Sequence, residues 1–287
     1  MASEVLQWLR PRPGAVLVDG TLGGGGHTRL LAEQVCPDGL VIALDRDPAA
    51  IDRAVVSLAG LPIKLIQSDF AELPDWLGQI GMPAVDGVLL DLGLSSDQLA
   101  DDGRGFSYDA EGPLDLRFDP EEGEPAWKLL EHISAGRLAD LIYEFGEERH
   151  SRRIAHRIVE RRRGDPIRTA RDLADLVRRC VPRAKRHSID PATRTFQALR
   201  IAVNGELSSL AAALKRIPGC LKSGGRFAVV SFHSLEDRLV KIAFRDDTRY
   251  VVLTKKPIRP NELEVQRNPR SRSARLRVAQ VGQAADG

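Results

Sequence analysis

The 287-residue sequence lacks long apolar runs, and it has only three cysteines. No stretch approaches the ~18 uninterrupted apolar residues of a transmembrane helix. The N-terminal MASEVLQWLRPRPG contains an acid and lacks the apolar core of a signal peptide. The cysteines are far apart and odd in number, so they offer neither a disulfide framework nor a Cys-x-x-Cys metal pair. We therefore expect a reduced, cytoplasmic protein with no membrane segment and no metal site.

Charge of either sign is not in large excess, because the formal net charge is only +2. Its distribution is uneven: acids dominate residues 101–125, and basic residues dominate 149–200 and 255–277. Two basic blocks in a nearly neutral protein fit a polyanionic partner. Solvated helix faces explain the same charges equally well.

Short apolar runs alternate with helical patterns in the first hundred residues. The runs are 15–19, 40–45, 63–69 and 85–91, and each ends in an aspartate. Unbroken apolar runs of this length are typical of strands buried on both faces. Helices are expected between them, at 27–35, 48–58 and 72–79. The alternation predicts a parallel sheet with right-handed crossovers.

This pattern is interrupted and then returns. Residues 104–191 show no strand-like run, so we expect an inserted helical domain there, with 1–103 and 192–287 forming the α/β domain. In the insertion, helices are expected at 126–133, 135–143, 147–163 and 170–180. After it we expect helices at 193–215 and 234–245, and strands at 225–232, 249–254 and 274–281. The last two strands flank a Pro- and Arg-rich loop of about twenty residues, a length that is usually functional or disordered.

A glycine-rich turn follows the first strand, in the segment DGTLGGGGH from Asp19 to His27. Glycines allow close approach of backbone N–H groups to a ligand, and the following helix start favours negative charge. The segment does not fit Gly-x-Gly-x-x-Gly, which weakens a dinucleotide interpretation. Asp45 ends the second strand and is placed to accept ribose hydroxyls. Asp69 with Phe70, and then Asp91, follow the third and fourth strands, so four acids should line one edge of the sheet.

The acidic edge suits a nucleoside-bearing cofactor without a phosphate chain. The sequence has no Gly-x-x-x-x-Gly-Lys-[Ser/Thr] element, so a P-loop enzyme is not expected. S-adenosylmethionine fits, because its cationic sulfonium and amino groups complement the aspartates. The expected final strand pair also matches the extra hairpin of class I methyltransferases. A nucleotide-dependent oxidoreductase and a non-catalytic RNA-binding protein are the alternatives.

Several longer motifs extend over nearly the whole chain in a familiar order. They are DGTLGGGGHT, ALDRDPAAI, LLDLGLSSDQLADDGRGFSYDAEGPLDLR, EERHSRRIAHRIV, ATRTFQALRIAVNGEL, SFHSLEDR and NPRSRSARLR. On these motifs the sequence closely resembles the ribosomal RNA small subunit methyltransferase H family, also called MraW. Family members usually open with a short His-x-x-Val-Leu-like segment, which this chain lacks.

The resemblance implies a class I methyltransferase: a Rossmann-like, mostly parallel seven-stranded sheet with an inserted all-helical domain. It implies transfer of a methyl group from S-adenosylmethionine to the N4 amino group of a cytidine in the decoding region of 16S rRNA. The partner would be small-subunit rRNA in an assembled or partly assembled 30S subunit. The implied cofactor contacts are Gly25, Gly26, His27, Asp45, Phe70, Asp91 and Gln98.

The residues that carry the chemistry are harder to identify. Cytosine N4 is a poor nucleophile, and an acceptor for its proton would activate it. The [Asp/Asn/Ser]-Pro-Pro-aromatic element of many amino methyltransferases is absent, so Asp91 and Ser95 are our candidates for contact with the amino group. His233 and Glu236 are further candidates.

Structural roles compete with these assignments. Ser234 and Asp237 fit a capping box at the start of the expected helix. C5 methylation would need a cysteine nucleophile, and we interpret all three cysteines as packing residues. For the RNA we expect phosphate contacts from the inserted domain, through Arg161, Arg162 and Arg163.

Overall fold

The computed structural model describes residues 1–182 and 190–282, and it divides the chain into two compact units. The first unit combines Met1–Gly93 with Leu207–Gly287, and the second is Leu94–Glu206. The expected insertion boundaries, residues 104 and 191, fall inside the second unit. Arg183, Lys185 and Arg186 of the basic block lie outside the described residues. Among the described residues, no helix combines the length and apolarity needed to cross a membrane.

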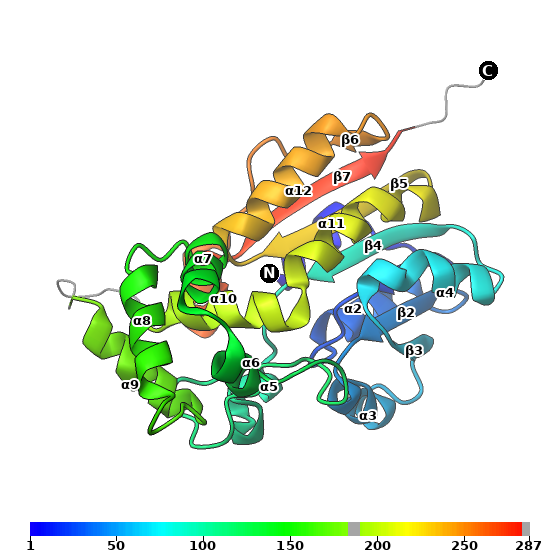
Figure 1. Cartoon of the computed structure of the whole chain (residues 1–287). Helices are drawn as coiled ribbons and strands as arrows, with labels where there is room; N and C mark the ends of the chain where they lie inside the picture. The colour runs from blue at the N-terminus through cyan, green and yellow to red at the C-terminus, as the bar shows by residue number, and fades with distance from the viewer. Residues whose placement is uncertain (183–189, 283–287) are drawn as a thin grey trace. The chain divides into compact units, whose positions relative to one another are not determined.

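The first unit is built on a seven-stranded sheet with the order β3-β2-β1-β4-β5-β7-β6 (Figure 1). The strands are β1 Val16–Asp19, β2 Leu40–Asp45, β3 Ile63–Gln67, β4 Val85–Asp91, β5 Leu221–Ser231, β6 Tyr250–Val252 and β7 Arg275–Val281. Strands β1 to β5 pair in parallel, and β7 pairs antiparallel with both β5 and β6. The mostly parallel seven-stranded sheet is therefore confirmed, including the final hairpin.

Helices cover both faces of this sheet. They are α1 Ala2–Leu9, α2 Gly26–Val35, α3 Pro48–Ser57, α4 Leu73–Gln79, α11 Glu206–Arg216 and α12 Ser234–Asp246. Helix α13 Glu262–Arg267 and short 3-10 helices at Phe70–Glu72, Ile217–Cys220 and Pro269–Ser273 lie in the connections between these elements. Successive strand residues point to opposite faces. Leu17 therefore packs in one cluster with side chains of α1 and α2, while Val18 packs in another with α4, α11 and α12. The strand ends are thus held between two apolar layers.

The second unit is helical. Its helices are α5 Ser96–Ala100, α6 Ala126–His132, α7 Ala135–Gly146, α8 Ser151–Arg161, α9 Ala170–Cys180 and α10 Thr193–Asn204, with a 3-10 helix at Asp102–Arg104. One apolar core unites them, and Phe196 and Leu199 place α10 in that core. The helix predicted over 193–215 is wrong in its continuity. Gly205, with φ of 62°, adopts the left-handed conformation and ends α10 before α11 begins.

Candidate active site

Four acids follow the carboxyl ends of β1 to β4, at one edge of the sheet in the first unit. Asp19, Asp45 and Asp91 are the last residues of their strands, and Asp69 comes two residues after β3. The register places Asp19 opposite Ala43 of β2. The structure therefore brings these four carboxylates to the edge where open α/β sheets bind ligands.

The glycine-rich turn adopts a backbone that most residues avoid. Gly25 is the N-cap of α2, with φ of 75°, and a Cβ atom there would lie 3.2 Å from a methyl carbon of Leu58. At Gly26 a Cβ would meet no protein atom within 4 Å. At Gly20 it would collide with Leu90 and lie 3.0 Å from Cβ of Phe70, so the aromatic residue predicted to contact a cofactor stands directly beside the turn.

Asp45 is held in place by backbone donors. The amide of Gly23 in the turn donates to Oδ2 at 2.7 Å, and the amide of Asp47 donates to Oδ1 at 2.9 Å. Burial raises the pKa of Asp45 to about 6, against these two hydrogen bonds, which lower it. A carboxylate offers about four lone-pair sites, so two acceptor positions remain for a ligand such as a ribose. The bond to Gly23 fixes this carboxylate against the glycine turn.

Asp19 and His27 form the buried centre of the edge. Asp19 is fully buried and accepts hydrogen bonds from Thr28 Oγ1 at 2.7 Å and from the amide of Thr21 at 3.1 Å. Burial raises the pKa of this carboxyl, and the nearby imidazole of His27 partly opposes the increase. Burial alone would lower the pKa of His27, but the carboxylates of Asp91 and Asp19 outweigh it and raise that pKa. The edge therefore holds a histidine between two carboxylates.

One carboxylate oxygen of Asp91 has no hydrogen-bond partner in the part of the chain that the structure describes. His27 Nε2 lies 3.3 Å from Asp91 Oδ2, and the amide of Asp91 donates to Thr21 Oγ1 at 2.6 Å. The other oxygen, Oδ1, is buried and accepts no hydrogen bond from the described residues. A buried acceptor without a donor is costly. This atom therefore suits a ligand that brings an N–H group to the edge.

Asp69 has a structural role next to Phe70, because both of its carboxylate oxygens accept hydrogen bonds. Its Oδ1 accepts the amide of Ala71, which caps the 3-10 helix that Phe70 begins, and its Oδ2 accepts Ser209 Oγ at 2.6 Å. Arg46 Nη1 also lies 3.5 Å from Oδ2. These contacts fix the backbone that carries Phe70, so Asp69 is a support for the aromatic residue rather than a free acceptor.

Ser95 and Gln98 belong to the second unit, where they form a capping box at the start of α5. Ser95 Oγ accepts the amide of Gln98 at 3.1 Å, and Gln98 Oε1 accepts the amide of Ser95 at 3.0 Å. Both residues thus have a structural role. Their assignments to catalysis and to cofactor binding stay predictions.

The capping box expected at Ser234 and Asp237 is wrong by one residue. Helix α12 begins at Ser234, so His233 is the N-cap, and its Nδ1 accepts the amide of Glu236 at 3.4 Å. Glu236 Oε2 accepts the amide of His233 at 3.2 Å. Asp237 instead receives Arg277 Nε at 2.7 Å. His233 and Glu236, our further catalytic candidates, thereby have a structural explanation.

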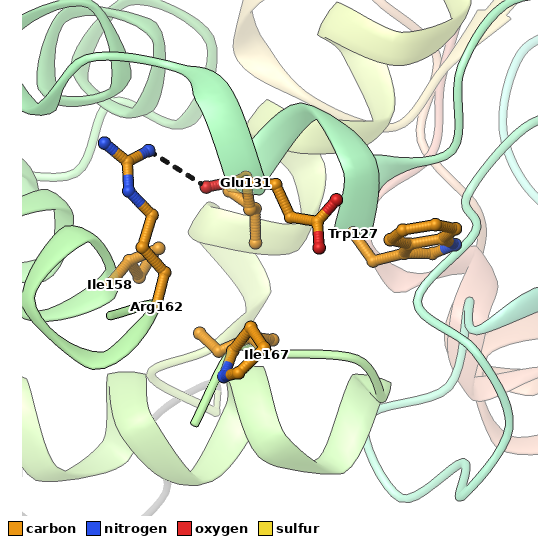
Figure 2. Close-up of a pocket in the computed structure, with 7 residues that line it drawn as sticks. Trp127, Glu131, Ile158, Arg162 and Ile167 are labelled. Carbon is orange, nitrogen blue, oxygen red and sulfur yellow. Dashed lines mark hydrogen bonds between the residues drawn. The ribbon is translucent and has the colours of Figure 1, made fainter. Parts of the chain in front are cut away.

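Two of the three arginines predicted to bind RNA are engaged inside the second unit. Arg161 pairs with Asp165 at 2.8 Å and with Asp172 at 2.9 Å. Figure 2 shows Arg162 reaching to the carbonyl oxygen of Leu130, at 3.3 Å, and this arginine also donates to the carbonyl of Ile133 at 2.7 Å. These carbonyls belong to the end of α6, which a cation stabilises.

Other arginines of this unit are better placed for a polyanion. Arg163 is exposed, and so are Arg152 and Arg153 on the face of α8 opposite the core. Burial raises the pKa of the Cys180 thiol, and the nearby charges of Arg153 and of Arg179 on α9 partly oppose this increase. The sequence pattern alone did not separate these exposed side chains from Arg161, because the block contains many basic residues. The spacing of the apolar residues Ile154 and Ile158 in α8 is the signal that could have done so.

Sequence reasoning also missed the two threonines that support Asp19. Thr21 and Thr28 stand within a glycine-rich segment that we interpreted only as a backbone feature. Thr28 follows His27 in the first turn of α2, so its hydroxyl faces back toward the strand end. A hydroxyl residue next to a buried acid in a motif is the signal for such a contact.

The sheet order, the antiparallel hairpin and the acidic edge beside a glycine turn define a class I methyltransferase fold. The chain belongs to the MraW methylase family, whose model matches residues 1–282. It is 52% identical to "Ribosomal RNA small subunit methyltransferase H" of Rhodopirellula baltica, over 97% of this chain and 89% of that protein. It is 48% identical to the protein of the same name from Geotalea uraniireducens, over 98% and 96%.

Solved structures with similar topology have little sequence identity to this chain. An rRNA methylase from Streptococcus thermophilus is 12% identical, with a TM-score of 0.46 and coverage of 98% of this chain and 94% of that one. Membership of a methylase family decides against the oxidoreductase and the non-catalytic RNA-binding protein as alternatives.

Proposed function

We propose that this protein transfers a methyl group from S-adenosylmethionine to the N4 amino group of a cytidine in the decoding region of 16S rRNA. Its membership of a methylase family and its similarity to small-subunit rRNA methyltransferases support the reaction class and the RNA. The observation that carries the amino-group chemistry is the buried, unpartnered Oδ1 of Asp91 at the end of β4.

The cofactor is S-adenosylmethionine, and the residues of the acidic edge fit it. Asp45 keeps free acceptor positions for the ribose hydroxyls, and Phe70 stands beside the glycine turn where an adenine would stack. Gly25 and Gly26 leave room for the close approach of a ligand to the backbone. When bound, the cofactor supplies an electrophilic methyl group on a sulfonium, and its positive charge is favoured by the aspartates of the edge.

Asp91 is our candidate for the residue that receives a hydrogen bond from the reacting amino group. The N4 lone pair is delocalised into the cytosine ring, so an acceptor on the amino hydrogen increases its availability and takes up the proton after transfer. His27, 3.3 Å from Oδ2, holds the carboxylate so that Oδ1 is the oxygen left for this contact.

The positions of the cysteines favour attack by an amino nitrogen over attack at C5. C5 methylation needs a thiolate nucleophile at the substrate. Cys36 follows α2, just before β2 begins, and Cys220 stands just before β5, so both are at the amino ends of strands. Cys180 is buried in the second unit. Cys36 is exposed, so our interpretation of it as a packing residue is wrong.

The second unit supplies phosphate contacts, in our proposal, through its exposed arginines, including Arg152, Arg153 and Arg163. A base in a duplex hides its N4 atom, so the cytidine must be unpaired or turned out of the helix. Folded RNA is recognised largely by shape. An assembled or partly assembled 30S subunit in the cytoplasm is therefore the proposed substrate, and a short oligonucleotide should be methylated poorly.

The role of Asp91 can be tested with Asp91→Asn and a matched control, Asp52→Asn, on the exposed face of α3. We expect Asp91→Asn to lower the methylation rate on purified small subunits at saturating S-adenosylmethionine by about 10²-fold or more, as for loss of a proton acceptor. The control should retain the full rate. Wild-type rates in Asp91→Asn would exclude the assignment. If the wild-type protein methylates subunits, naked rRNA and a short oligonucleotide at equal rates, recognition of the folded substrate is excluded.

A further inference from the structure

The segment between β6 and β7 is long and strongly basic, and it contains α13 and a 3-10 helix. Residues 253–274 contain six basic residues and two acids. Helix α13, within this segment, buries no side chain. In the 3-10 helix that follows, Ser271 is buried, and its Oγ donates to the carbonyl of Asn268 at 2.7 Å. Leu253, Ile258 and Ala274 pack near the two ends of the segment, but apolar packing does not explain the part between them.

Three arginines of this segment are exposed and have no acidic partner among the described residues. Arg259, Arg267 and Arg272 are exposed and make no ion pair with any residue in 1–182 or 190–282. The neighbouring arginines on β7 behave differently. Arg275 and Arg277 both pair with Asp237, at 3.3 Å and 2.7 Å. The two arginines on the strand are thus neutralised, whereas Arg259, Arg267 and Arg272 are available to another anion.

Strand register places the segment beside the acidic edge of the same unit. Arg275, the first residue of β7, is paired with Ser231, the last residue of β5. Ile258 and Leu276 exchange both backbone hydrogen bonds, at 2.9 Å each. Residues 259–273 therefore extend beyond the carboxyl end of β5. Asp91 lies at the same end, because it is paired with Val230 of that strand.

We propose that Arg259, Arg267 and Arg272 bind phosphates of the rRNA next to the target nucleotide. This inference rests on the proposed function and adds a second RNA-contacting surface, on the sheet unit itself. When an RNA chain brings one base to the acidic edge, the phosphates next to that base pass the three exposed arginines of this segment. A guanidinium group without an acidic partner binds phosphate in a bidentate manner.

The triple variant Arg259→Gln, Arg267→Gln and Arg272→Gln tests the proposal. Its matched control is Lys64→Gln, Lys215→Gln and Lys241→Gln, which removes the same charge from exposed, unpaired residues of the same unit. Binding of full-length protein to small-subunit rRNA would be measured between about 0.05 and 0.2 M salt. We expect the salt-dependence exponent to fall by roughly 2, and affinity to fall on the order of tenfold or more, only in the arginine triple.

Kinetics separate this inference from the proposed function. We expect a higher KM for the RNA in the arginine triple, with an unchanged kcat and an unchanged Kd for S-adenosylmethionine. If the wild-type protein methylates the RNA and the arginine triple matches the lysine control in salt dependence and KM, the segment does not bind phosphate. If the wild type neither binds nor methylates the RNA, the proposed function fails together with the inference.

Discussion

Replacing Thr28 with valine should destabilise the protein by removing one hydrogen bond from a buried carboxyl group. Thr28 and Asp19 are both fully buried, and the hydroxyl donates to Oδ2 at 2.7 Å. Valine has nearly the same shape, so the change removes the donor without a large cavity. A hydrogen bond to a charged group contributes about 1.5–3 kcal/mol. At roughly 2–4 °C per kcal/mol, the Tm should fall by about 3–12 °C.

The dependence of this loss on pH gives the sharper test. Burial raises the pKa of Asp19, and the Thr28 hydrogen bond lowers it, so Thr28→Val should raise that pKa further. The valine variant is therefore most destabilised at a pH where Asp19 is ionised in the wild type. The difference should narrow as the pH falls through the raised pKa, because a neutral carboxyl loses less when the donor is removed.

Thr28→Ser is the matched control. It keeps the hydroxyl and loses a buried methyl group, which costs about 1 kcal/mol with no dependence on pH. Melting curves of the wild type and both variants from pH 8 downward would separate the two effects. A valine variant with wild-type stability throughout this pH range, or a stability difference that does not change with pH, would refute the role given to this hydrogen bond.

Further predictions concern the cofactor and RNA contacts. Because the pKa of Asp45 lies at about 6, affinity for S-adenosylmethionine should fall as the pH drops through 6, and calorimetry should show a lower affinity with no such step in Asp45→Ala. Gly26→Ala should keep the wild-type Tm and weaken cofactor binding. Gly25→Ala should lower the Tm, because its left-handed backbone costs a residue with a Cβ atom about 1 kcal/mol. Melting curves and cofactor titrations of both variants check these expectations. Arg161→Gln should lower the Tm with little effect on the salt dependence of RNA binding. Arg152→Gln should keep the wild-type Tm and reduce that salt dependence. Equal behaviour of the two variants would contradict the assignment of Arg161 to the fold and of Arg152 to the RNA.

Much of the fold could be predicted because its signals are local. Each parallel strand is an unbroken apolar run, and such runs are required where both faces of a sheet are covered. The break of the 193–215 helix could not be predicted from periodicity, because the apolar pattern continues across Gly205. The left-handed backbone of the single residue Gly205 ends α10, and α11 begins directly after it.

The positions of site residues at strand ends were predictable, because the backbone geometry of a strand fixes them. The partners of the basic side chains were less predictable, because tertiary contacts determine them. A strand that ends in aspartate places that residue at the sheet edge whatever else occurs, as Asp45 and Asp91 show. Whether a basic residue faces solvent or an acid depends on tertiary contacts. Arg161 lies 11 residues before its partner Asp172, and no local pattern in the sequence indicates that pair.

The identity of the methylated atom distinguishes the proposed reaction from other methylations of rRNA, and nucleoside analysis determines it. Small subunits lacking the modification would be incubated with this protein and methyl-labelled S-adenosylmethionine. Their rRNA would then be digested and analysed by mass spectrometry against authentic methylcytidine standards. We predict that the label appears in N4-methylcytidine from a decoding-region fragment, and that Asp91→Asn greatly reduces it. Label in 5-methylcytidine, on a ribose hydroxyl or in another part of the rRNA would contradict the account.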